Sequence, residues 1–207
     1  YSLKLFFNKM KAIKFIASLF VSATVLSSAI AGNAPKKAAE GLAVDTKGSK
    51  IHWLAKKVTG QHEGFISISN GSLSVAKGKV TGGTFTIDMK SIVCTDITDA
   101  GYNQKFISHI TTGDFFEVEK FPTATFKITK VAGSNITGDL TLHGITKSIT
   151  FPATITSAAG KVTATAKIPV DRTDFNIKYG SKKFFESIGD KAIDDVFNLD
   201  VTLVAGK

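Results

Sequence analysis

The 207-residue sequence is poor in two residue types that commonly crosslink or charge a small protein. It has one cysteine, Cys94, and one arginine, Arg172. A single cysteine excludes a disulfide within the chain, so stability has to come from packing, and we interpret Cys94 as a packed or loop thiol. The net charge is +9, but the lysines are spread along the chain. Because nucleic-acid binding needs a concentrated Lys/Arg stripe, we expect no nucleic-acid partner, only transient contact with anionic membrane surfaces.

Motifs that carry catalysis or metal binding are also missing. No GxSxG segment occurs, so nothing places a nucleophilic serine beside a histidine and a carboxylate. The four histidines, His52, His62, His109 and His143, show no HxH or HxxxH spacing. The adjacent His62 and Glu63 would point to opposite faces of an extended segment. Since a zinc site generally needs three or four convergent ligands, we predict no metal site and no catalytic residues.

The first 31 residues have the pattern of a secretory signal peptide. Lys11 and Lys14 follow Met10, an apolar run extends from residue 13 to about residue 26, and a small-x-small cleavage site lies at 29–31. The run is too short for a membrane span of about 20 residues. We therefore predict export to the periplasm, with residues 1–9 as an over-extended reading frame. A lipoprotein anchor is not expected, because no cysteine directly follows the cleavage site.

Beyond a flexible arm expected at residues 32–43, apolar residues alternate with polar ones, which indicates strands with one buried face. The clearest segments lie at residues 51–55, 80–88, 124–128, 136–142, 149–155, 162–168 and 197–203. A further segment at 65–69 is followed by Asn70-Gly71, a strong hairpin-turn signal. Together these segments predict eight or nine antiparallel strands.

Two stretches depart from this alternation. In residues 98–110, Tyr102, Phe106 and Ile110 are spaced four apart, which suits a short amphipathic helix. Residues 171–195 are polar with aromatic pairs and are expected to form a long ordered loop.

Strands with one apolar face form either a sandwich or a closed barrel. The meander order and short turns favour closure, which also removes exposed strand edges. An outer-membrane barrel would turn its apolar faces to lipid and fill its lumen with threonine and lysine. Long extracellular loops and aromatic girdles are missing as well. We therefore predict an all-β fold, a soluble antiparallel eight-stranded barrel over residues 44–207 with its apolar faces inward.

A set of ordered motifs gives a more specific resemblance. They are VTGQHEG at 58–64, FTIDMKSI at 85–92, DFFEV at 114–118, KFPTATF at 120–126, GDLTLHGITK at 138–147 and DRTDF at 171–175. Over roughly residues 42–205 the chain closely resembles the YceI-like family of polyisoprenoid-binding, lipocalin-like periplasmic proteins. The resemblance implies an extended lipocalin-like barrel whose pore holds an isoprenoid chain, such as a quinone-type lipid.

The interior of an eight-stranded barrel is either just filled by side chains or able to hold one small ligand. The predicted inward face carries the small residues Gly138, Ala153, Ala164 and Ala166. These either interdigitate with aromatic rings in a filled core or leave a tunnel. If a tunnel is present, the expected ligand-binding residues are Trp53, Phe85, Phe126, Leu140, Phe151, Ala164, Ala166, Phe197 and Leu199.

Three groups of residues outside the predicted strands are expected to pack against the barrel or close its end. Asp171, Arg172 and Asp174 predict an arginine–carboxylate pair that caps the barrel. Phe115-Phe116 are expected to pack a loop or helix over the barrel rather than touch ligand. Phe184-Phe185 either pack in the same way or line the barrel mouth.

The predicted function is that of a periplasmic carrier, store or scavenger of a long-chain isoprenoid, quinone-like or polyprenyl, acting as a monomer or homodimer. No cofactor other than bound lipid and no enzymatic activity are expected. One alternative is an enzyme acting on a bound lipid, with His62, His143 or Arg172 as polar agents. Another is a ligand-free structural or stress protein with a filled core, which would yield no extractable small molecule.

Overall fold

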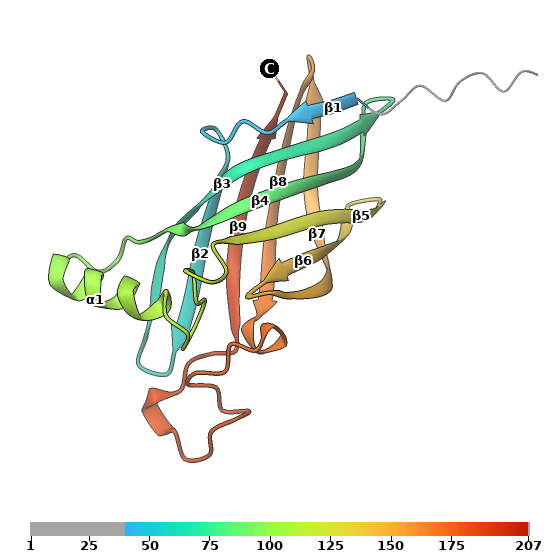
Figure 1. Cartoon of the computed structure of the whole chain (residues 1–207). Coiled ribbons are helices and arrows are strands. Elements are labelled where there is room, and N and C mark those ends of the chain that lie inside the picture. The colour runs from blue at the N-terminus through green and yellow to red at the C-terminus, as the bar shows by residue number, and fades with distance from the viewer. Residues whose placement is uncertain (1–39, 207) are drawn as a thin grey trace, which may run out of the picture. The chain divides into compact units, whose positions relative to one another are not determined.

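The computed structural model describes residues 40–206 (Figure 1). The expected signal peptide at 1–31 and most of the arm at 32–43 lie outside the described residues. The described strands and helices are β1 (Glu40–Ala43), β2 (Lys50–Lys57), β3 (Gly60–Ala76), β4 (Lys79–Cys94), α1 (Ala100–Ile110), β5 (Thr123–Ala132), β6 (Asn135–Leu142), β7 (Ile145–Ala158), β8 (Lys161–Asp171), η1 (Arg172–Phe175), η2 (Gly189–Lys191) and β9 (Val196–Ala205). Within these residues no helix is long and apolar enough to cross a membrane.

The strands close into an antiparallel barrel. From β2 the hydrogen-bonded order runs through β9, β8, β7, β6, β5 and β4 to β3, and β3 pairs again with β2. This confirms the predicted eight-stranded all-β fold. The ninth strand, β1, pairs with Ser72–Val75 of β3, next to the stretch of β3 that pairs with β2. Residues 40–43 are therefore part of the sheet, and their assignment to a flexible arm was wrong.

The turn predicted at Asn70-Gly71 is also wrong, because β3 runs straight through it. Asn70 pairs with Thr86 of β4, and Gly71 pairs with Phe85, next to a shift in register. A Cβ on Gly71 would lie 2.9 Å from the Phe85 ring, so the glycine allows a close approach instead of a turn. The hairpin turn comes later at Lys77-Gly78, where both residues have positive φ, 52° and 73°, as a type I′ turn requires.

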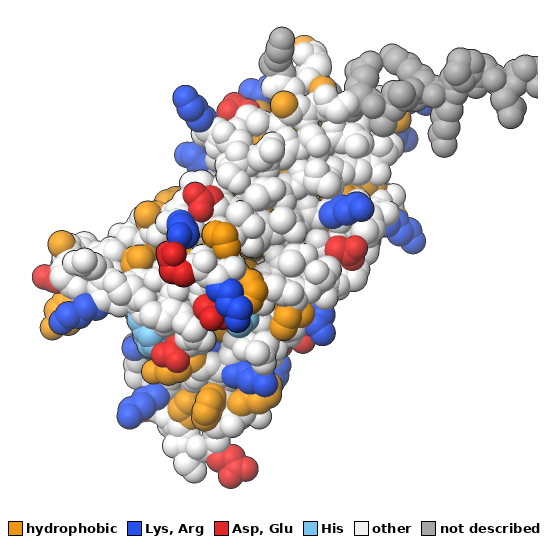
Figure 2. Space-filling model, in the orientation of Figure 1, with side chains coloured by type: hydrophobic (Ala, Val, Ile, Leu, Met, Phe, Trp, Pro, Cys, Tyr) orange, Lys and Arg blue, Asp and Glu red, His pale blue; other side chains and the backbone are white. Residues whose placement is uncertain are grey.

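Buried side chains form two apolar clusters inside the barrel, and most of them come from alternate positions of the strands. One cluster contains Ile51, Ile68, Leu73, Val80, Phe85, Val162, Leu203 and Ala205. The other contains Trp53, Met89, Ile92, Cys94, Ile110, Phe115, Val118, Ala124, Leu140, Leu142, Val170, Phe175 and Ile177. Their outward neighbours are mostly threonine, lysine and serine, and Figure 2 shows lysines and acidic residues interspersed on one face.

The helix α1 covers part of the second cluster. Its N-cap Asp99 accepts a hydrogen bond from the Tyr102 amide at 2.8 Å. The Phe106 ring stacks 6.2 Å from that of Trp53, and Ile110 is buried. Tyr102 was expected to share this buried face, but it is 68% exposed. Tyr102 and Ile110 are eight residues apart, which at about 100° per residue places them roughly 80° apart around the helix axis. The strip of α1 that contacts the barrel is too narrow to bury both side chains.

The ladder between β7 and β8 is incomplete. It joins six residue pairs, from Ala158↔Lys161 to Ala153↔Ala166. The next residue of β7 is Pro152, and β8 carries Pro169 three residues beyond Ala166. Proline has no N–H to donate to a ladder. In the described structure the remaining half of β7 pairs with β6 alone, and the remaining half of β8 with β9 alone.

Residues 171–195 form the predicted ordered loop between β8 and β9, with two short 3-10 helices. The loop lies beyond the end of the barrel in Figure 1. His143, in the tight turn between β6 and β7, contacts the Phe175 carbonyl through Nδ1 at 3.0 Å. This contact ties the loop to the β6–β7 hairpin.

Candidate functional site

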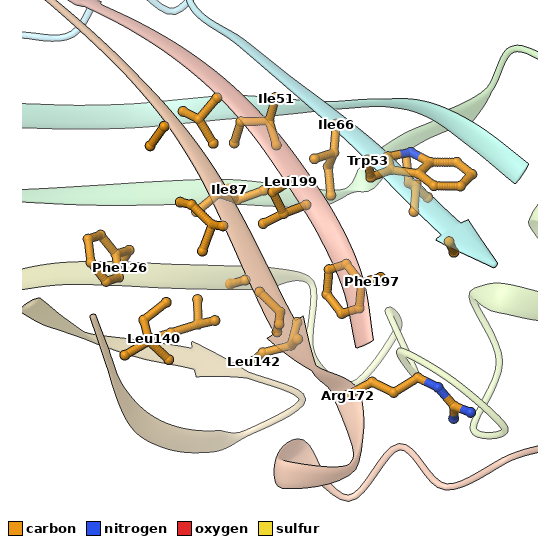
Figure 3. Close-up of a pocket in the computed structure, with 18 of the residues that line it drawn as sticks. Ile51, Trp53, Ile66, Ile87, Phe126, Leu140, Leu142, Arg172, Phe197 and Leu199 are labelled. Carbon is orange, nitrogen blue, oxygen red and sulfur yellow. The ribbon is translucent and has the colours of Figure 1, made fainter. Parts of the chain in front are cut away.

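A cavity of about 420 Å³ lies inside the barrel. Its volume falls in the usual range of ligand sites, about 300–1,000 Å³. All nine residues predicted to bind ligand line it: Trp53, Phe85, Phe126, Leu140, Phe151, Ala164, Ala166, Phe197 and Leu199. Figure 3 shows five of them among the labelled lining residues, and they come from four different strands. The sequence therefore identified side chains that share one space, and their contact with a ligand stays a prediction.

Small side chains on β7 and β8 leave part of this space open. Ala153 pairs directly with Ala166, and Ala164 pairs with Ile155. All four residues line the cavity. Gly138 was expected to contribute space in the same way, but a Cβ there would lie 2.4 Å from Cζ of Phe126. The Phe126 ring occupies that position, so Gly138 accommodates the aromatic residue and leaves no room for ligand.

The cavity has a polar end and an apolar shaft. At the polar end it is lined by Lys56, Lys57, Gln61, His62, His109, Arg172 and Asp194, which come from the end of β2, the start of β3, α1 and the 171–195 loop. The shaft is lined almost entirely by aliphatic and aromatic side chains. Such a site suits a long apolar molecule with one polar terminus.

Arg172 holds the loop at this polar end. Its side chain is buried, and its Nε, Nη1 and Nη2 donate to the carbonyls of Asp194, Ile177 and Ile193 at 3.0, 2.9 and 3.1 Å. The nearest carboxylate contact is Asp195, at 3.6 Å. The predicted pairing of Arg172 with its sequence neighbours is therefore wrong, although the arginine does secure the end of the barrel. Figure 3 shows it beyond Phe197.

The sequence neighbour Asp171 has a different partner. Its Oδ2 lies 2.6 Å from Lys183 Nζ, and its Oδ1 accepts from the Thr173 hydroxyl at 2.6 Å. Burial favours a higher pKa for Asp171, but these hydrogen bonds outweigh it and lower the pKa below the ordinary value. This ion pair links Asp171, at the start of the 171–195 loop, to Lys183 in the middle of the loop.

His62 also lies at the polar end, together with two residues that the sequence did not connect to it. Its Nδ1 is 2.8 Å from Oδ2 of Asp96, and the Cys94 thiol donates to Oδ1 of the same carboxylate at 3.1 Å. Burial favours a higher pKa for Asp96, but hydrogen bonds from the Glu63 amide, His62 and Cys94 hold that pKa at about 2. Burial and the hydrogen bond to Asp96 raise the pKa of the Cys94 thiol.

The other histidines are separate from this group. Glu63 points away from His62, as predicted, and pairs with His52 at 3.2 Å. His109 lies 3.0 Å from Asp114. His143, one of the polar agents of the enzyme alternative, packs against Phe121 and is not among the described residues that line the cavity. The histidines therefore do not converge on one centre.

Several aromatic residues lie in places that the sequence analysis did not predict. Phe115 and Phe116 line the cavity as well as packing below the barrel. Phe184 and Phe185 are about half exposed and do not belong to the described lining. Phe106 and Ile193 also line the cavity. The spacing in residues 98–110 placed Phe106 on the apolar face of a helix but not in the cavity, and no periodic signal pointed to Ile193 in the loop.

The YceI-like domain model matches residues 42–205. The chain belongs to the YceI-like family. Curated relatives of the YceI-like chain include a UPF0312 protein of Vibrio parahaemolyticus, 38% identical over 105 residues, which covers 44% of this chain and 56% of the relative. A UPF0312 protein of Pseudomonas putida is 49% identical over 51 residues, 22% of this chain and 27% of the relative. These matches thus span about half or less of the relatives' length.

Solved structures share the YceI-like barrel. BcnA of Burkholderia cenocepacia superposes with a TM-score of 0.62 at 25% identity, covering 78% of this chain and 99% of that one. A domain from Saccharophagus degradans described as polyisoprenoid-binding superposes with a TM-score of 0.58 at 13% identity, covering 82% and 99%. The second likeness concerns the fold alone.

Proposed function

We propose that this YceI-like chain binds one long-chain isoprenoid lipid inside its barrel and acts as a periplasmic carrier, store or scavenger. The observation that carries the proposal is the apolar shaft that ends in polar groups on one side only. Along β9 the lining runs from Phe197 to Leu203, a distance of about 20 Å at roughly 3.3 Å per residue. An elongated apolar site of this kind matches a chain molecule better than a compact one.

The polar end supplies positions for a lipid headgroup. Lys56, Lys57 and Gln61 are exposed there and line the cavity, so their side chains can contact both solvent and a polar terminus. A quinone ring or a prenyl phosphate presents oxygen acceptors, which lysine and glutamine side chains bind as donors. The Saccharophagus degradans domain, described as polyisoprenoid-binding, adds support from a shared fold.

The periplasmic location rests on the leader pattern at residues 1–31. A protein exported there and carrying an apolar cavity would keep a lipid out of water between membranes. The carrier, storage and scavenging roles share this binding step.

The test is to express the full reading frame in a bacterium, purify the exported protein without detergent, and compare native with denaturing mass spectra. We expect a stoichiometric adduct that is released on unfolding, extracts into organic solvent and has the mass of an isoprenoid. A bare protein that stays unchanged after incubation with a quinone or polyprenyl phosphate would refute the proposal and support a filled or differently used barrel. Cleavage near residue 31, read from the same denatured mass, tests export.

A further inference from the structure

We infer that His62, Cys94 and Asp96 form a binding site for one Zn²⁺ ion at the polar end of the cavity. One donor atom from each of the three side chains lies within 4.8 Å of the others. The three offer an imidazole nitrogen, a thiol sulfur and a carboxylate oxygen, which are the donor types that Zn²⁺ accepts. This inference does not depend on the lipid proposal.

The barrel holds these residues on a rigid frame. Cys94 ends β4, where it pairs with Gly64 of β3, two residues after His62. The Thr95 amide donates to the Glu63 carbonyl at 2.9 Å, so β4 stays bonded to β3 past its last strand residue. The Glu63 amide in turn donates to Oδ1 of Asp96 at 2.9 Å. A hydrogen bond to a ligating carboxylate from outside the metal's own ligands orients that ligand.

The distances fit an ion after a small expansion. Zn–S, Zn–N and Zn–O bonds of about 2.3, 2.0–2.1 and 2.0–2.2 Å at tetrahedral angles put the donor atoms roughly 3.3–3.6 Å apart. At present His62 Nδ1 is 2.8 Å from Oδ2 of Asp96 and Cys94 Sγ is 3.1 Å from Oδ1 of the same carboxylate, and one donor atom from each residue lies within 4.8 Å of the others. An ion therefore needs the contacts to Asp96 to lengthen slightly and the three side chains to rotate toward a common centre, which would turn a hydrogen-bonded group into a three-ligand site.

The charges balance when the ion binds. Cys94 loses its S–H proton to solvent as the Zn–S bond forms, while His62 binds as the neutral ring and Asp96 as the carboxylate it already is. Thiolate and carboxylate then carry two negative charges against the two positive charges of Zn²⁺. The ion therefore takes the place of the thiol proton and adds no uncompensated charge.

Of the three ligands, only His62 is among the described residues that line the cavity, so a fourth ligand would have to reach the ion from the His62 side. His62 itself lines the cavity, and the ring of Phe106 packs against it at 4.6 Å between centroids. Three protein ligands with one open position are typical of zinc sites that bind water or an external group. The fourth ligand would therefore be water or a polar atom of whatever occupies the polar end of the cavity.

The probe is Co²⁺, which takes zinc sites and shows a thiolate-to-cobalt charge-transfer absorption when sulfur binds. The purified exported protein is stripped with chelator under reducing conditions and titrated. We expect one Co²⁺ per chain, the charge-transfer band, and its loss on addition of Zn²⁺. Cys94→Ser should abolish the band and Asp96→Asn should weaken binding about 10–100-fold. His109→Gln is the matched control, because His109 and Asp114 form a similar pair at 3.0 Å without a neighbouring thiol.

Two results would overturn the site. One is the absence of a thiolate–cobalt band in folded wild-type protein, which needs no variant. The other is a Cys94→Ser protein, folded by circular dichroism, that binds Co²⁺ or Zn²⁺ as tightly as wild type. If Cys94→Ser does not fold, Asp96→Asn decides: unchanged affinity in a folded Asp96→Asn protein refutes the site. Failure of the lipid test leaves all these outcomes unaffected.

Discussion

Ala153 of β7 and Ala166 of β8 are directly paired on adjacent strands of the barrel wall, and both face the cavity. They form the last pair of the β7–β8 ladder. Two methyl groups at this position leave open space that larger side chains would fill.

Filling that space should expel the ligand. Ala166→Trp, or Ala164→Trp one inward position along, places an indole in the cavity, so we expect loss of most of the bound lipid. Folding should survive with a cost of about 1–3 kcal/mol, because the indole enters existing space. Lipid load by native mass spectrometry and the urea midpoint measure the two effects. The control is Thr154→Trp, an exposed outward residue of β7, and a full load in the folded alanine variants would remove the tunnel assignment.

Removing the Arg172 guanidinium should destabilise the whole barrel. Arg172→Met leaves three loop carbonyls and Asp195 without their buried partner. Loss of one side of a buried ionic contact costs roughly 3–5 kcal/mol, which urea unfolding would detect. Lys183→Met, at a side chain 53% exposed, should cost much less, because solvent screens its ion pairs. Similar losses in the two variants would contradict the anchoring role of Arg172.

Acidification should weaken the loop through Asp171. Hydrogen bonds from Lys183 and Thr173 lower its pKa in the folded protein below the unfolded value of 3.8. The folded state therefore binds fewer protons, so this group stabilises the protein above pH 3.8 and loses the effect as pH falls through its lowered pKa. In urea unfolding between about pH 6 and pH 2, Asp171→Asn should flatten the decline in stability. Asp174→Asn, at an exposed neighbour, should leave the decline as in wild type.

Gly138→Ala should be poorly tolerated. An added Cβ would meet Cζ of Phe126 at 2.4 Å and the Lys127 carbonyl oxygen at 2.6 Å, so ring and backbone must both shift. Overpacking of this kind costs about 1–3 kcal/mol. Gly41→Ala in β1, where nothing lies within 4 Å of the new Cβ, should change stability far less. Thermal or urea unfolding compares the two, and equal effects would show that Phe126 gives way freely.

The barrel could be predicted from the sequence because its strands have one apolar face each. Period-two alternation depends only on the local chain, and it placed Trp53, Phe126 and Phe197 in one interior before any pairing was known. The turn at Lys77-Gly78 was harder to identify, because Asn70-Gly71 carries the stronger turn signal. In the fold, that glycine serves the close approach of Phe85, which is a tertiary requirement.

The group formed by His62, Cys94 and Asp96 could not be predicted in this way. His62 lies more than 30 residues from Cys94 and Asp96 in the sequence, and the shift in register between Phe65 and Ser67 decides which residues of β3 and β4 meet. Local patterns do not specify such a shift. The same reason hid the true partners of Arg172, which come from the far end of a long loop.

The short ladder between β7 and β8 has a consequence for how the proposed lipid would enter and leave the barrel. Beyond Ala153 and Ala166 no described backbone pairing joins the two strands, so this part of the wall has no hydrogen-bond ladder that must break before the strands separate. A long lipid would then not have to enter through the end of the barrel. Side-chain motion takes picoseconds to nanoseconds when exposed and loop motion nanoseconds to microseconds, whereas breaking a strand ladder requires local unfolding. For a lipid bound as proposed, we expect exchange through this part of the wall, where Pro152 and Pro169 have no N–H to donate to a ladder.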